Sequence, residues 1–169
     1  MNLASLKPEQ IVPDLKSTDH LEAISELLSL LFDYLAQVQN TSLPESVKAK
    51  TYLSLTQREE KISTGIGSGV AIPHAFSEDI DEMAVIFGRS KKGVDFEAVD
   101  NNPVYFIVLF LVPKKDYHQH LQTLAAIAKL FTRSDIRKEL ALAESRDDIL
   151  AVFNKHAVNS LVFTFFASA

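Results

Sequence analysis

Cysteine is absent from the 169 residues, which excludes disulfides, thiolate zinc sites and a cysteine nucleophile. Clusters of lysine and arginine are also missing and the net charge is -5, so we expect no binding to nucleic acid. The longest apolar run, 104–112, is much shorter than the roughly 20 residues of a membrane helix, so we expect no membrane insertion. The N-terminus has no basic region before an apolar core, so we expect no signal peptide and a cytoplasmic protein.

The composition, with 47% hydrophobic and 23% charged residues, is that of an ordinary globular protein. We predict one domain over residues 1–156 and an apolar C-terminal extension over residues 157–169. The aromatic segment 160–166 has two interpretations, an edge strand packed on the same domain or a surface for self-association. The oligomeric state therefore stays open.

Three amphipathic patterns predict helices. The first starts after Thr18 or Asp19 as the cap, and the second starts at a capping box of Ser42 and Glu45, with Pro44 in its first turn, and runs to about Arg58. The third is capped by Asp116, and two short helices follow near 134–143 and 146–154. The buried stripes consist of Leu21, Ile24, Leu28, Leu31 and Leu35 in the first helix, and Leu121, Leu124, Ala128 and Phe131 in the third.

Between the second and third helices, continuous apolar runs indicate buried strands at 70–72, 83–87 and 104–112. Pro73 is expected to end the first strand, and the glycine-rich segment 63–69 before it is expected to be a flexible, turn-forming loop. Helices on both sides of such strands predict an α/β sandwich.

His74 differs from the other histidines in its setting. It follows a buried strand and Pro73, and ligands gather at strand ends in open α/β sheets. The glycines just upstream allow backbone N–H groups to approach an anion, and Arg58 offers a planar fork of donors to phosphoryl oxygens. Because a neutral imidazole keeps a lone pair at pH 7, His74 is a candidate nucleophile.

The other motifs are weaker. The glycine segment is neither a dinucleotide fingerprint nor a Walker motif. His118 and His120 are two positions apart on the predicted helix and point about 200° apart, so they cannot easily share one metal ion, and we predict no metal. If one of them reaches His74, His120 is preferred because it borders the buried face. We assign no function to His20 or His156.

Several segments match the pattern of one known family. They are Arg58-Glu59, Ser63 to His74, Phe96 to Val104, Leu111 to Pro113, and His120-Leu121 with Leu124 and Ile127-Ala128. Together they resemble the enzyme IIA domains of the fructose–mannitol class, which belong to the bacterial phosphoenolpyruvate-dependent phosphotransferase system and include the nitrogen-regulatory type. The resemblance spans roughly residues 6 to 154, with Ala75 where many members have Gly.

The resemblance implies a mixed β-sheet sandwiched between helices, with a phosphotransferase activity that needs no cofactor. His74 would accept a phosphoryl group on Nε2 from the carrier protein HPr or its nitrogen-branch counterpart, with His120 as second active-site histidine and Arg58 near the phosphoryl group. The phosphoryl oxygens would also be bound at Thr64, Gly65 and Gly67.

Three functions remain open after the resemblance. We favour a regulatory, nitrogen-type enzyme IIA, whose phosphorylation alters binding to target proteins. A sugar-transport enzyme IIA would instead pass the phosphoryl group to a separate enzyme IIB. A non-catalytic binding module with the same fold is the third, and the intact Arg58, His74 and His120 argue against it.

Overall fold

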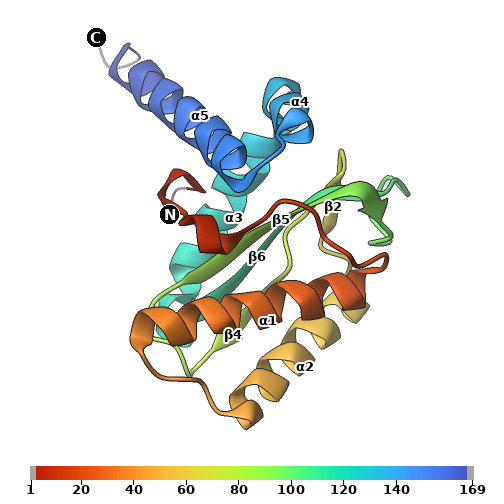
Figure 1. Ribbon diagram of the computed structural model, residues 1–169, viewed down its shortest axis with the longest axis vertical. Helices are drawn as coiled ribbons and strands as arrows, with labels where there is room; N and C mark the ends of the chain where they lie inside the picture. Colours follow the sequence, from red (N-terminus) through yellow and green to blue (C-terminus); the bar gives the residue numbers. More distant parts are fainter. Residues whose placement is uncertain (1–2, 167–169) are drawn as a thin grey trace.

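The computed structural model describes residues 3–166, with side chains outside 117–119 and 158–166. Its strands form one mixed sheet with helices on both faces (Figure 1), which confirms the predicted α/β architecture. The described residues contain no helix long and apolar enough to cross a membrane.

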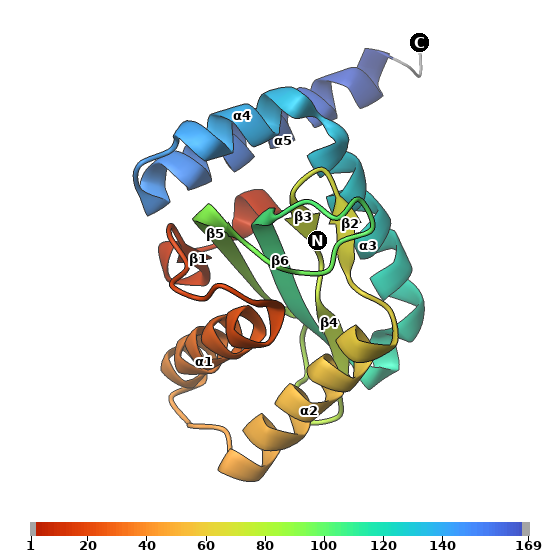
Figure 2. The same cartoon turned by 90° about the vertical axis from the view of Figure 1, so that its right-hand side faces the viewer.

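The helices lie in two groups on opposite faces of the sheet. The first group is α1 (His20–Gln39) and α2 (Glu45–Lys61), and the second is α3 (Tyr117–Thr132), α4 (Ser134–Leu142) and α5 (Arg146–Phe166). Figure 2 shows α1 and α2 below the sheet, with α4 and α5 above it. Short 3₁₀ helices occupy Leu3–Ser5, Pro8–Gln10 and Lys114–Asp116.

The sheet order is β1-β5-β6-β3-β2, and β4 also pairs with β6. The central strands β5 and β6 are antiparallel, whereas β1 pairs in parallel with β5, and both β3 and β4 pair in parallel with β6. The strands are β1 (Ile11–Val12), β2 (Gly65–Gly67), β3 (Val70–Ala71), β4 (His74–Ser77), β5 (Ala84–Val94) and β6 (Val104–Pro113).

Strand β6 is buried on both faces and supplies both hydrophobic cores. Ile107, Leu109 and Leu111 belong to the core under α1 and α2. Phe106 and Phe110 alternate with them and belong to the core under α3, α4 and α5. The continuous apolar run was therefore correctly interpreted as a strand covered by helices on both sides.

The helix starts agree only in part with the sequence patterns. Asp19 caps α1 as predicted, because its carboxylate accepts the N–H groups of Leu21 and Glu22. The capping box predicted for α2 is wrong, since Pro44 occupies the N-cap position and no side chain caps the helix. Asp116 precedes α3, but its side chain makes no capping hydrogen bond either.

The glycine-rich segment is a β-hairpin rather than the predicted flexible loop. Strand β2 pairs antiparallel with β3 across a turn at Ser68 and Gly69. Both turn residues have positive φ, 57° and 76°, as a tight two-residue hairpin turn requires. Strand β3 ends before Pro73, as predicted, and a separate strand, β4, begins at His74 along the same neighbour, β6.

Two predictions for the C-terminal third are wrong. Leu121 was placed in the buried stripe of α3 but is 58% exposed, and the helix buries the neighbouring His120, Thr123 and Ile127 instead. One position corresponds to about 100° of rotation around a helix, so a small shift moves a side chain out of the core. Helix α5 extends to Phe166, so the aromatic tail is helical rather than an edge strand, and the helix also contains the buried His156.

Candidate functional site

His74 is the first residue of β4 and lies at a break in the sheet. It is the register partner of Phe110 on β6, and the two rings stack with centroids 5.4 Å apart. Pro73 before it has no N–H to donate, and its carbonyl accepts the N–H of Phe110 at 3.1 Å. The imidazole is therefore half-buried at the β3–β4 junction, and not at the end of the sheet as the strand pattern predicted.

One hydrogen bond determines the tautomer of His74. Its Nδ1 lies 2.9 Å from the carbonyl oxygen of Ile72. A carbonyl oxygen only accepts hydrogen bonds, so the proton of the neutral ring is on Nδ1 and the lone pair is on Nε2. Burial lowers the pKa of His74 below its ordinary 6.5, the Ile72 carbonyl raises it in part, and the Arg58 charge lowers it further. The ring is therefore neutral at pH 7 and Nε2 is nucleophilic.

A chain of hydrogen bonds connects His74 to the last turn of α2. Glu59, which is only 5% exposed, accepts the Thr64 N–H at 2.7 Å and the Thr64 hydroxyl at 2.6 Å. The Thr64 carbonyl accepts the Ile72 N–H at 3.1 Å, and Ile72 in turn binds His74. The buried carboxylate thus positions the strand segment that orients the imidazole. The sequence patterns gave Glu59 no role, because glutamate is usually a surface residue.

A cavity of about 420 Å³ opens beside His74, which we call the His74 cavity. Its lining comes from α2, the β-hairpin, β4 and α3. A volume of this size lies in the range of small-ligand sites. The lining residues are Arg58, Ser63, Thr64, Ile66, Ile72, His74, Leu121, Leu124, Ala125 and Ala128.

Arg58 and His120 both lie next to His74, as predicted from the sequence. Arg58 lines the His74 cavity, and its Nη1 donates to the Ile62 carbonyl at 2.8 Å, which fixes one arm of the guanidinium. The His120 ring centroid is 6.2 Å from that of His74, and its ring packs edge-on against Phe76 at 4.8 Å. His120 is 5% exposed, whereas the side chain of His118 is outside the described ones.

The three residues predicted to bind phosphoryl oxygens have different environments. Thr64 lines the His74 cavity, but its N–H is already bound to Glu59. Gly65 and Gly67 are not lining residues of the His74 cavity, and the Gly65 N–H donates to Ser63 Oγ at 3.0 Å. A β-carbon at Gly65 would lie 2.7 Å from that of Ala98, so this glycine is required for close packing.

Apolar side chains form part of the rim of the His74 cavity. Ile66 is 45% exposed and Leu121 is 58% exposed, and both line the cavity. Exposed apolar groups around a polar centre are typical of protein-docking surfaces. The cavity thus combines neutral His74, the cation Arg58 and an apolar rim. No group of three potential metal ligands occurs among the described residues.

Comparison with known proteins gives consistent matches. The family model described as "Phosphoenolpyruvate-dependent sugar phosphotransferase system, EIIA 2" matches residues 4–156. The chain is 40% identical over 103 residues to the fructose-specific EIIABC component of Bacillus subtilis, covering 61% of this chain but 16% of that protein. It is 32% identical over 145 residues to a nitrogen regulatory protein of Bradyrhizobium diazoefficiens, covering 86% of this chain and 89% of the relative.

Among solved structures, the nitrogen regulatory protein IIA-Ntr of Neisseria meningitidis is similar over 87% of this chain and 94% of its own. The TM-score is 0.75 and the sequence identity is 29%. Because the match extends over most of both chains, the architecture described above is that of a known fold.

Proposed function

Because the chain belongs to the EIIA 2 family of the phosphoenolpyruvate-dependent sugar phosphotransferase system, we propose that His74 accepts a phosphoryl group on Nε2. The donor in this proposal is a phosphorylated HPr-type carrier, HPr itself or its nitrogen-branch counterpart, acting in the cytoplasm. The observation that carries the proposal is the hydrogen bond between His74 Nδ1 and the Ile72 carbonyl, which leaves the lone pair on Nε2.

The transfer step needs no cofactor in this scheme. The Nε2 lone pair of His74 attacks phosphorus in line with the N–P bond of the donor's phosphohistidine. That bond breaks, and its electron pair returns to the donor's imidazole. Positive charge builds on the His74 ring as the new bond forms, and the Ile72 carbonyl at 2.9 Å stabilises the proton on Nδ1.

Arg58 and His120 are proposed to stabilise the phosphoryl oxygens. Arg58 keeps donors besides the Nη1–H that binds Ile62, and a guanidinium suits phosphoryl oxygens geometrically. His120 lies close enough to His74 for its ring to reach a group carried on Nε2. We retain Thr64, Gly65 and Gly67 as candidate contacts, and Thr64 is the one of the three that lines the His74 cavity.

We propose a regulatory role of the nitrogen type, in which phosphorylation of His74 changes the affinity for a target protein. The similarity to a nitrogen regulatory protein over 86% of the chain supports this role. A specific observation also favours transport as the second candidate: the fructose-specific relative has the higher identity, 40%, over its shorter match. In that case the phosphoryl group would pass to a separate enzyme IIB.

The test is incubation of the protein with phosphoenolpyruvate, enzyme I and an HPr-type carrier, followed by intact-mass measurement and site mapping. We expect one acid-labile phosphoryl group, located on His74. The His74→Ala variant should take up none, while His20→Ala, a matched change at a histidine outside the His74 cavity, should behave as wild type. Uptake by His74→Ala would refute the proposal, and no uptake by the wild type would favour a non-catalytic binding module.

The role of His120 needs a separate variant, because this side chain is buried against Phe76 and truncation would also leave a cavity. We expect His120→Gln to slow phosphoryl uptake without changing the circular dichroism spectrum. An unchanged rate would remove His120 from the mechanism. A subsequent search for a phosphate-accepting enzyme IIB, set against a partner whose binding depends on phosphorylation, separates transport from regulation.

A further inference from the structure

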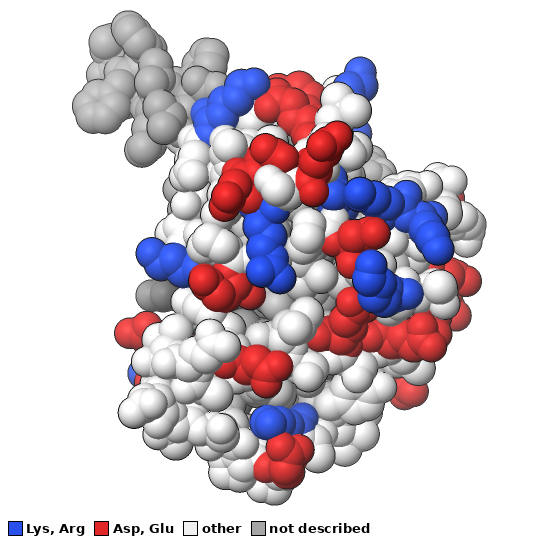
Figure 3. Space-filling view, viewed as in Figure 1, with Lys and Arg blue, Asp and Glu red and all other residues white. Residues whose placement is uncertain are grey.

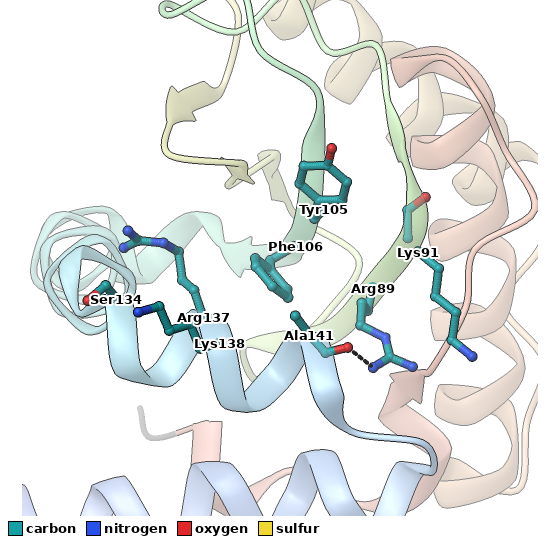
Figure 4. A pocket seen from close by; sticks show the side chains of 9 residues that line it. Arg89, Lys91, Tyr105, Phe106, Ser134, Arg137, Lys138 and Ala141 are labelled. Carbon is teal, nitrogen blue, oxygen red and sulfur yellow. Dashed lines mark hydrogen bonds between the residues drawn. The ribbon is translucent and has the colours of Figure 1, made fainter.

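A second cavity, of about 590 Å³, lies between α4 and the adjoining strands β5 and β6. We call it the α4–β5 cavity. It shares no lining residue with the His74 cavity. Figure 4 shows α4 on one side, β5 on the other, and the rings of Tyr105 and Phe106 between them. The lining residues are Arg89, Ser90, Lys91, Tyr105, Phe106, Ser134, Arg137, Lys138 and Ala141.

The walls of the α4–β5 cavity are fixed by buried contacts. Arg89 is 2% exposed, its Nε donates to the Pro13 carbonyl at 2.8 Å, and its Nη1 donates to the carbonyls of Leu140 and Ala143 at the end of α4. This side chain ties α4 to β5. Because the walls are held before any ligand arrives, little conformational entropy would be lost on binding.

The aromatic wall is also fixed. The Tyr105 ring lies against two glycines, since a β-carbon would come within 3.0 Å of it at Gly69 and 3.2 Å at Gly93. Phe106 stacks on Phe131 of α3 with ring centroids 6.0 Å apart. The cavity therefore offers flat, preformed apolar surface, which suits an apolar body of similar shape.

The charge of the α4–β5 cavity has one sign. Four of its nine lining residues are Lys or Arg and none is Asp or Glu, although the whole chain has 22 acidic and 17 basic residues. Figure 3 shows one face of the molecule, on which acidic and basic side chains are mixed. Within the described part of the chain, Lys91, Arg137 and Lys138 form no ion pair with a carboxylate.

Two acidic residues, Asp14 and Asp148, interact with lining residues without being part of the lining themselves. Asp14 accepts the backbone N–H of Lys91 at 3.0 Å, and Asp14 and Asp148 act on the charge of Arg89. Figure 4 shows the side chains of Arg137 and Lys138 running outward from α4, and that of Lys91 running outward from β5. Their charged ends thus flank the apolar centre from both sides.

We propose that the α4–β5 cavity binds a small organic anion with a flat apolar body. The body lies against Tyr105 and Phe106, and the anionic group pairs with Lys138 or Lys91 at the rim. This site is independent of phosphoryl transfer at His74, since the two cavities share no residue.

The test uses two fluorescent probes with the same aromatic body, anilinonaphthalene sulfonate, which is anionic, and phenylnaphthylamine, which is neutral. We expect the sulfonate to bind the folded protein at one site, with affinity that falls as salt is raised. In a titration followed by two-dimensional amide NMR, the shifted signals should belong to β5, the start of β6 and α4.

Variants at exposed positions distinguish the contribution of the cavity's shape to binding from that of its charge. Ala141→Trp fills the cavity and should abolish binding of both probes. The Lys91→Glu/Lys138→Glu double variant should weaken the sulfonate about tenfold and leave the neutral probe unchanged. Lys129→Glu, an exposed change on α3 outside the cavity, is the matched control and should weaken sulfonate binding much less. Sulfonate binding that survives Ala141→Trp, or that Lys129→Glu weakens equally, would overturn the proposal.

Discussion

Removal of the Glu59 carboxylate should destabilise the protein strongly, because this group is buried and accepts two hydrogen bonds from Thr64. A hydrogen bond to a charged group contributes about 1.5–3 kcal/mol. Glu59→Ala loses both bonds and leaves the Thr64 N–H buried without its acceptor. We therefore expect the free energy of unfolding to fall by about 3 kcal/mol, which is the lower end of the summed range for two such bonds. For a chain of this size that corresponds to a fall in Tm of about 6–12 °C.

A conservative variant distinguishes the hydrogen bonds from the volume of the side chain. In Glu59→Gln, the amide oxygen accepts the Thr64 N–H, and the amide nitrogen donates to the Thr64 hydroxyl, which also accepts hydrogen bonds. Both contacts survive without the charge, so we expect a loss of about 1 kcal/mol. Glu60→Ala, at the exposed neighbouring position, is the control and should change stability by no more than about 0.5 kcal/mol.

The assay is urea unfolding followed by circular dichroism, with calorimetry for Tm. Unfolding of Glu59→Ala and Glu60→Ala at the same urea concentration would show that the Glu59 carboxylate does not stabilise the fold. A second readout is phosphoryl uptake, because Thr64 and Ile72 connect Glu59 to the His74 imidazole. Glu59→Ala should slow uptake even at temperatures where the variant is fully folded, and Glu59→Gln should restore most of the rate.

Three further predictions follow from single contacts. Burial lowers the pKa of His74, so the NMR titration of its ring should have a midpoint below 6.5. Since the unfolded chain binds this proton more readily, the stability contributed by neutral His74 is present above pH 6.5 and is lost as the pH falls through the pKa of the folded protein. His74→Phe should remove that part of the pH dependence. A midpoint above 6.5 would contradict the assignment of a lowered pKa. In urea unfolding, Gly65→Ala should lower the free energy of unfolding by about 2 kcal/mol, which is more than Gly88→Ala should. The new β-carbon at Gly65 would meet the Cα and Cβ of Ala98, whereas that at Gly88 would meet the ends of flexible leucine side chains. Asp19→Ala should cost about 1 kcal/mol of unfolding free energy through the lost N-cap of α1, and equal stability would show that the cap is replaced by water.

Local patterns predicted those elements whose signals lie within a few residues. The cap at Asp19 and the strand over 104–112, predicted from a continuous apolar run, depend on neighbours in the chain, and both were confirmed. The capping box at Ser42 failed because Pro44 takes the N-cap position, and a motif of two residues does not determine which residue begins the helix. The exposure of Leu121 was missed because adjacent helical positions point about 100° apart. A stripe of four apolar residues does not fix the direction of the buried face to within one position.

The glycine segment shows a different limit. Its composition indicated a turn, and the structure has that turn at Ser68 and Gly69. The strand after the turn was predicted from the apolar run 70–72 and is β3, whereas β2, before the turn, was not predicted. Strand β2 consists of Gly65, Ile66 and Gly67, which have no apolar pattern of their own, and its existence depends on pairing with β3.

The sequence by itself predicted His74 as the chemical centre, with Arg58 and His120 beside it, because a long family signature and the chemistry of imidazole both belong to the residues themselves. Only the tertiary structure supplied the physical reason for the lone pair on Nε2 that the resemblance implied, since the proton on Nδ1 is held by the Ile72 carbonyl at the β3–β4 junction. It also decided that Glu59 and Arg89 are buried, against the usual preference of charged residues for solvent. Burial and hydrogen-bond partners arise between segments distant in the chain, and no local pattern contains them.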